Sequence, residues 1–239
     1  MEAYTYSNLF DTKGIEYIVI IFFLLLLIPF WLIVNRKSET GNIIQEAVKV
    51  FATSVLSIPK GLFYSRNHAW LYLEKSGQAK IGIDDFLLKV LGKVNVVPSK
   101  SAGEYIKKGD VIALIEKDGK KLKIHSPVSG EIFGFNSELK EDATSLSADP
   151  YGDGWLYIVQ PENWKNETSG FFLGNEVMPW MDRELQRLKD FLNVSYSKYT
   201  DTAMALVYQE GGELQQNPLA DLETAVWDDF QNEFLEQIG

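Results

Sequence analysis

The chain has 239 residues, with 23 lysines and arginines, 33 aspartates and glutamates, and no cysteine. Its length and its 46% hydrophobic fraction allow one domain of ordinary size with appendages. The lack of cysteine excludes disulfides, thiol nucleophiles and iron–sulfur ligation, and the net charge of −10 disfavours nucleic-acid binding.

An uncharged apolar run, Tyr17–Val34, follows a short N-terminal flank of residues 1–16. About 20 apolar residues cross a bilayer as a helix, so the run predicts a single-pass transmembrane helix rather than a cleaved signal peptide. Pro29 lies inside the run and can kink the helix. Arg36 and Lys37 follow directly. The positive-inside tendency therefore places the N-terminus outside and the globular part on the cytoplasmic side of a bacterial inner (cytoplasmic) membrane.

Residues 35–61 form a juxtamembrane segment that is expected to be a helix or linker. Its apolar residues recur at helical spacing: Ile44, Val48, Phe51 and Val55. This spacing predicts a helix over Thr40–Ile58, which proline and glycine then end. Such a helix lies either along the membrane surface or, as a spacer, against the following domain. Its polar face is not especially basic, which favours the spacer.

Residues 62–164 alternate short apolar runs with glycine and proline breaks, a pattern typical of a small sandwich or barrel. The expected strands are 70–74, 78–83, 93–97, 111–117, 120–126, 131–135 and 154–160. Asp84 is expected to cap a helix over 85–91 that ends at Gly92. One or two helical turns are expected over 136–142.

The centre of this domain is a predicted hairpin. Val111–Lys117 and Lys120–Ser126 are joined by Asp118 and Gly119, a strong hairpin signal because a two-residue primed turn needs positive φ at both central residues. The hairpin is rich in lysine: Lys117, Lys120, Lys121 and Lys123. It suits either a lysine-protected sheet edge or a docking surface for an acidic partner.

Five stretches share their order and spacing with a known family. They are Tyr64-Ser-Arg-Asn-His-Ala-Trp70, Ile81-Gly-Ile-Asp-Asp85, Leu91-Gly-Lys-Val94, Ser126-Pro-Val-Ser-Gly-Glu131 and Asp149-Pro-Tyr-Gly-Asp-Gly-Trp-Leu156. Together they resemble the glycine cleavage system H-protein family over about residues 62–164. The resemblance implies the barrel-sandwich hybrid of lipoyl and biotinyl domains. The expected fold class is thus mainly β, with an N-terminal transmembrane helix and a C-terminal helical extension.

The resemblance also implies where a lipoyl-lysine would lie. Counting back from Ser126, that position is Gly119, and glycine cannot form the amide to lipoic acid. Lys117 and Lys120 flank the turn, but a shift of one residue in a hairpin sends a side chain to the opposite face. We therefore expect the fold to be kept and the carrier chemistry to be lost. No cofactor is expected unless lipoate is attached to Lys117 or Lys120.

The tail carries the net charge. Residues 1–165 hold 19 basic and 19 acidic residues, whereas residues 166–239 hold 4 and 14. Apolar periodicity predicts a helix over about Glu176–Asn193. A second helix is expected to start at Asn217-Pro218, after a break at Gly211-Gly212.

The last helix presents an apolar stripe that needs cover. Trp227, Phe230 and Phe234 either pack on the barrel or, because acidic residues surround them, dock into a basic groove of a partner protein. We favour docking. The two histidines, His68 and His125, belong to no ligand cluster and are expected to be structural.

These features predict a membrane-anchored, non-catalytic subunit. It would dock or scaffold a membrane-associated enzyme assembly, and a redox or lipoate-related kind of assembly is expected by analogy alone. No nucleotide loop, metal cluster or nucleophile motif appears, so neither an enzyme nor a metal site is expected. One alternative is a lipoyl carrier that uses Lys117 or Lys120. Another is a membrane-fusion-type export adaptor, which needs the domain outside the cytoplasm and usually a long coiled coil, and the sequence has no sustained heptads.

Overall fold

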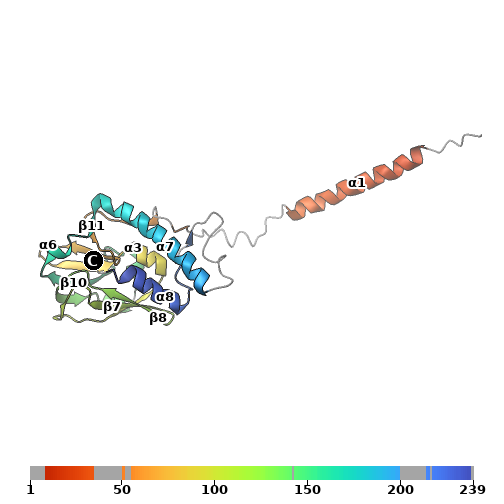
Figure 1. Ribbon diagram of the computed structural model, residues 1–239. Coiled ribbons are helices and arrows are strands. Elements are labelled where there is room, and N and C mark those ends of the chain that lie inside the picture. Colours follow the sequence, from red (N-terminus) through yellow and green to blue (C-terminus); the bar gives the residue numbers. More distant parts are fainter. Residues whose placement is uncertain are drawn as a thin grey trace, which may run out of the picture. The chain divides into compact units, whose positions relative to one another are not determined.

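The computed structural model describes residues 9–34, 50–51, 55–141, 143–199, 214–215 and 217–237. The chain divides into two compact units, Met1–Val48 and Lys49–Gly239, which are described separately (Figure 1). Three parts of the sequence-based expectations lie outside the described residues. They are positions 1–8 of the N-terminal flank, positions 35–49 and 52–54 of the juxtamembrane segment, and the break at Gly211-Gly212.

The first unit contains helix α1 (Leu9–Val34), which is 26 residues long and includes Pro29. Its apolar side chains from Tyr17 to Ile28 are all exposed. Among the residues that the structure describes, no helix is long and apolar enough to cross a membrane. The membrane span expected over Tyr17–Val34 therefore stays a prediction.

The second unit consists mainly of antiparallel β structure. A seven-stranded sheet has the order β11-β2-β3-β4-β10-β9-β6, a three-stranded sheet has the order β5-β7-β8, and β1 pairs with β12. The strands are β1 Val50–Phe51, β2 Phe63–Tyr64, β3 Ala69–Leu73, β4 Ala79–Ile83, β5 Asn95–Pro98, β6 Tyr105–Ile106, β7 Val111–Lys117, β8 Lys120–His125, β9 Gly130–Phe135, β10 Trp155–Pro161, β11 Phe172–Leu173 and β12 Leu214–Gln215. This architecture confirms the expected mainly β fold, and each predicted strand is present within one or two residues of its expected bounds.

Short helices connect the strands, and the C-terminal helices α7 and α8 follow the seven-stranded and three-stranded sheets in the sequence. The helices of the second unit are α3 Asp85–Leu91, α4 Glu138–Glu141, α5 Thr144–Ala148, α6 Trp164–Glu167, η2 Gly174–Glu176, α7 Val177–Tyr199, α8 Thr224–Phe230 and the π-helical turn η3 Gln231–Leu235. The predicted cap of α3 is confirmed, because the Asp84 side chain accepts a hydrogen bond from the Leu87 N–H at 2.9 Å. Gly92, at φ 74°, ends this helix.

Three of the sequence motifs have a packing explanation. Trp70 is fully buried and donates from its indole Nε1 to the Pro150 carbonyl at 3.0 Å. A Cβ on Gly82 would lie 2.5 Å from the Trp70 ring, so only glycine fits beneath the indole. In the motif that begins at Asp149, the Gly152 N–H donates to the Asp149 carboxylate at 3.0 Å, which closes the turn that leads into β10.

The juxtamembrane helix prediction is wrong where the structure describes it. Val50–Phe51 forms the short strand β1, which pairs antiparallel with β12 (Leu214–Gln215). β-branched and aromatic residues adopt extended structure readily when a partner strand is available. The partner comes from more than 160 positions later in the chain, which helical spacing in a short window cannot anticipate.

The C-terminal helices are present, but the second starts later than predicted. The expected helix over Glu176–Asn193 is confirmed as α7, which extends to Tyr199. α8 begins at Thr224 rather than at Asn217. Asn217 has φ 57°, outside the helical region, and its N–H donates to the Lys89 carbonyl of α3 at 2.9 Å. The segment before α8 is thus held by α3 instead of starting a helix.

Both C-terminal helices complete the core of the barrel. Figure 1 shows α8 next to α7 and β8, and both helices bury apolar faces in the same cluster as the sheets. Trp227, Phe230 and Phe234 are each 0% exposed. The interpretation that these three side chains dock a partner is therefore corrected: they pack on the chain's own barrel, and they offer no free surface.

Candidate functional site at the β7–β8 hairpin

The hairpin turn has the predicted geometry. Asp118 has φ 49° and Gly119 has φ 80°, so both central residues are in the left-handed region that a primed turn requires. Lys117 pairs directly with Lys120 across the turn. Both turn residues are exposed, and nothing lies within 4 Å of a Cβ built on Gly119. The position that the resemblance assigns to a lipoyl-lysine is thus open to solvent but has no amine.

Lys120 is buried beneath the segment that precedes α8. Its side-chain ammonium donates to the carbonyls of Ala220 at 2.6 Å and Leu222 at 3.0 Å. It also lies 5.0 Å from the ring centroid of Trp227. Only 9% of Lys120 is exposed. This lysine therefore stabilises the C-terminal segment on the hairpin.

Lys117 and Lys121 also have partners within the chain. The ammonium of Lys117 donates to the Leu91 carbonyl at the end of α3, at 2.8 Å. Lys121 is exposed and forms an ion pair with Glu116 across the hairpin, at 2.7 Å. Of these lysines, Lys121 has its charge balanced by a carboxylate, whereas Lys117 and Lys120 are held by backbone carbonyls.

The free edge of β8 is covered by a side-chain amide. The Lys123 N–H donates to Gln231 Oε1 at 2.7 Å, and Gln231 Nε2 donates to the Lys123 carbonyl at 3.3 Å. One residue of η3 therefore satisfies both backbone groups of an edge-strand residue, as a neighbouring strand would. His125 continues the contact, because its Nε2 lies 3.2 Å from Glu236 and its Nδ1 lies 2.8 Å from the Gly109 carbonyl.

One side of the hairpin tip stays open. A cavity of about 600 Å³ lies there, between the tip and α5. Glu116, Lys117 and Asp118 line it on the hairpin side, and Thr144 and Ala148 line it on the opposite side. The hairpin thus has one face covered by the chain itself and one face next to a cavity.

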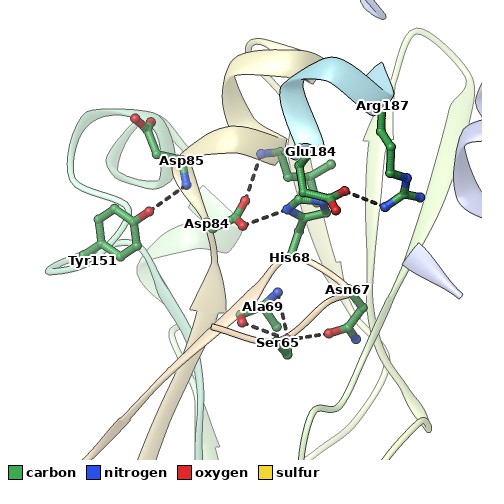
Figure 2. Close-up of polar contacts among 10 residues, drawn as sticks. Ser65, Asn67, His68, Ala69, Asp84, Asp85, Tyr151, Glu184 and Arg187 are labelled. Atoms are coloured by element: carbon green, nitrogen blue, oxygen red, sulfur yellow. Dashed lines mark hydrogen bonds and ion pairs between the residues drawn. The ribbon is translucent and has the colours of Figure 1, made fainter. Parts of the chain in front are cut away.

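A buried ion cluster fixes α7 to the barrel near the hairpin. Figure 2 shows His68 between Asp84 and Glu184, with Arg187 on the far side of Glu184. His68 Nδ1 lies 2.8 Å from Asp84, its Nε2 lies 3.7 Å from Glu184, and Arg187 donates to Glu184 at 2.6 Å. The His68 ring stacks on Phe86, with centroids 4.6 Å apart.

The carboxylates keep this histidine protonated. Burial alone lowers the pKa of His68, but the charge and hydrogen bond of Asp84, together with Glu184, raise it to about 9. Burial tends to raise the pKa of Glu184, but His68 and Arg187 outweigh it and lower this pKa. The expected structural role of His68 is thus confirmed, and its function is to hold α7 on the barrel.

The structure separates the predicted site residues into two groups. Asp118 and Gly119 are at the exposed tip, whereas Lys120 and the aromatic residues of the last helix are brought together in the interior. Sequence reasoning missed Gln231 and Glu184, because their partners lie far away in the sequence and no local pattern marks them. Among the described residues, no group of three acidic, histidine or cysteine side chains could hold a metal ion.

Comparisons with known proteins place the barrel in a family. Residues 62–181 match the family model described as "Glycine cleavage H-protein". The chain is 32% identical over 107 residues to a glycine cleavage system H protein of Psychrobacter sp. (strain PRwf-1), which covers 45% of this chain and 85% of that relative. It is 32% identical over 110 residues to a probable glycine cleavage system H protein of Pyrococcus abyssi, which covers 46% and 81%. A crystal structure of a glycine cleavage system H protein from Mycobacterium marinum matches with 29% identity, a TM-score of 0.40, and coverage of 44% of this chain and 86% of that chain.

Proposed function

This chain belongs to the glycine cleavage H-protein family, and we propose that it is a membrane-anchored member that carries no lipoyl group. It serves as a non-catalytic docking subunit of a membrane-associated enzyme assembly. The observation that carries the proposal is at the hairpin tip. The attachment position is Gly119, and the ammonium groups of Lys117 and Lys120 are both held by carbonyls of the chain.

A lipoyl carrier needs a lysine whose amine is free for attachment and whose side chain can move. Acylation of Lys120 would remove its charge and pull it away from two carbonyls that it now satisfies. A buried polar group left without a partner costs about 1–3 kcal/mol. Lys117 is half-buried and donates to Leu91, so its modification would likewise break a contact between the hairpin and α3. The alternative of a shifted lipoyl carrier is therefore disfavoured at both lysines.

The docking surface is the exposed tip of the hairpin and the cavity beside it. Asp118 and Gly119 are exposed, and the cavity of about 600 Å³ gives a partner side chain room to insert. The opposite face is filled by α8 and η3. A partner enzyme of redox or lipoate-related chemistry would thus meet the hairpin from the cavity side.

The membrane anchor is Tyr17–Val34. The apolar side chains from Tyr17 to Ile28 are between 41% and 68% exposed, and a row of that length needs an apolar environment to cover it. Arg36 and Lys37 follow the run, which favours a cytoplasmic location for the globular unit.

The lack of lipoylation is tested by the intact mass of the full chain from cells that make lipoate, with peptide mapping of residues 109–123. We expect an unmodified mass. The matched control is Gly119→Lys, which restores an amine at the family position. The surrounding space is open, and the φ of 80° imposes some backbone strain at the exposed turn. This variant is expected to gain a lipoyl group. A lipoyl increment on Lys117 or Lys120 of the natural chain would instead make it a carrier.

Docking is tested by affinity purification of the tagged full chain from membranes. Ala148→Trp places a large side chain at the rim of the cavity, and Ala102→Trp does the same at an exposed position that does not line it. We expect a co-purifying partner whose yield falls severalfold for Ala148→Trp only. An equal yield for both variants would rule out the cavity as the docking site.

A further inference from the structure

Arginine is rare in this chain and gathers along one groove. The sequence has four arginines, and three of them, Arg66, Arg183 and Arg187, line two cavities of about 360 and 370 Å³. The two cavities share Arg66 and Gln237 as lining residues, so together they form what we call the arginine groove. Lys108 lines the first cavity as a fourth cation. This concentration of positive charge stands out in a protein with a net charge of −10.

The carboxylates that line the groove are already bound. Glu167 accepts hydrogen bonds from the Ser129 N–H at 2.7 Å and the Ser129 hydroxyl at 2.6 Å. Glu184 is held between His68 and Arg187 (Figure 2). Neither Glu167 nor Glu184 forms an ion pair with Arg66 or Arg183 among the described residues.

Arg66 and Arg183 are exposed, and no carboxylate of the part of the chain that the structure describes pairs with them. Among the described residues, neither forms an ion pair. Arg66 lies 5.9 Å from the ring centroid of Phe172, which itself stacks on Trp180 with centroids 4.6 Å apart. An aromatic wall orients a guanidinium and reduces its hydration without supplying a counter-charge.

From this arrangement we propose that the arginine groove binds the oxyanion group, phosphate or carboxylate, of a small molecule. Guanidinium groups bind such groups through two parallel hydrogen bonds, which suits a site with two unpaired arginines. The cavity volumes fall in the range of small-molecule sites. Arg183 and Arg187 lie beyond residue 181, where the family match ends, whereas Arg66 and Lys108 lie within it, so the groove lies between the barrel and the C-terminal extension. The proposal does not depend on the docking function.

The test is isothermal titration calorimetry of the full-length protein with pyrophosphate and, separately, with citrate. The variants are Arg66→Gln and Arg183→Gln, both at exposed positions, where little effect on folding is expected. Lys75→Gln, which removes one positive charge from an exposed turn outside the groove, is the matched control. The thermal midpoint of each variant is measured alongside to verify that it is folded.

We expect saturable binding of at least one of the two anions, and its selectivity assigns the ligand to the phosphate or the carboxylate class. Each arginine variant should weaken binding about tenfold, the loss expected for one charge-assisted hydrogen bond, and Lys75→Gln should leave it unchanged. Absence of binding by the natural protein, or equal affinity in folded Arg66→Gln and Arg183→Gln variants, would overturn the proposal.

Discussion

At the scale of single residues, two buried cations attach the C-terminal extension to the barrel. Lys120 donates to two carbonyls of the segment before α8, and His68 lies between a carboxylate of the barrel and one of α7. Burial of a charge is costly unless partners surround it. Each cation therefore stabilises the fold only while its partners stay in place, and this makes both testable.

Lys120→Met keeps most of the side-chain volume but leaves the carbonyls of Ala220 and Leu222 without their donor. We expect the free energy of unfolding to fall by about 1–3 kcal/mol, because one buried and one partly buried acceptor lose their donor. Chemical denaturation measures this change. Lys121→Met is the control: its ammonium is exposed and pairs with Glu116 at the surface, so its loss should change stability by less than about 1 kcal/mol. Equal effects of the two substitutions would contradict a structural role for Lys120.

His68 should give the fold a pH dependence above neutrality. Its pKa in the folded chain is about 9, above the ordinary value of 6.5, so its stabilising contribution is complete below pH 6.5 and is lost as the pH rises through about 9. The loss amounts to at most about 3 kcal/mol. Thermal midpoints measured from pH 6 to 9.5 should fall with pH for the natural chain.

His68→Gln is the matched comparison, because an amide cannot gain or lose a proton in this range. We expect this variant to be less stable at pH 6 and to show a flatter dependence between pH 6.5 and 9. Parallel curves for the two proteins would show that another group is responsible.

At the scale of elements, η3 acts on β8 as a short substitute strand. Gln231 bonds to both the N–H and the carbonyl of Lys123, which an exposed edge strand would otherwise offer to another chain. Gln231→Met removes both hydrogen bonds at nearly constant volume, so the Lys123 amide should lose protection against hydrogen exchange and stability should fall by about 1–2 kcal/mol.

The control for this prediction is Gln237→Met. Gln237 donates to the Glu233 carbonyl at an exposed position, and its loss should leave exchange at Lys123 unchanged. Unchanged protection of Lys123 in the Gln231 variant would show that η3 does not shield the edge of β8.

The hairpin could be predicted from local sequence, whereas the contacts of α8 and η3 with it could not. The turn at Asp118 and Gly119 follows from two residues that tolerate positive φ, so the sequence alone was sufficient. The start of the last helix was misplaced because a tertiary contact from Asn217 to Lys89 outweighs a local capping signal. The contact of Gln231 with Lys123 joins residues 108 positions apart and leaves no trace in a local pattern.

At the scale of the whole molecule, part of the C-terminal tail covers one face of the lysine-rich hairpin. Residues 166–239 carry the excess of acidic residues, and α8 and η3, which belong to this tail, contact β8 of the hairpin. Glu236 contacts His125, and the segment before α8 binds Lys120. The tail thus covers one face of the hairpin mainly through backbone carbonyls and a side-chain amide, and the tip side is the face left for docking.

The proposed membrane anchor and its orientation can both be tested. If Tyr17–Val34 is the anchor, the full chain should remain in the membrane fraction after a wash with high salt, whereas a chain that begins at Lys49, the start of the second unit, should be released. A reporter that is active only in the cytoplasm, fused after Gly239, should be active because Arg36 and Lys37 favour a cytoplasmic globular unit. Activity of a reporter that works only outside the cytoplasm would reverse the orientation and favour the export-adaptor alternative. Release of the full chain by salt would instead show that Tyr17–Val34 is not a membrane anchor. The lipoylation test at Gly119 does not depend on that result.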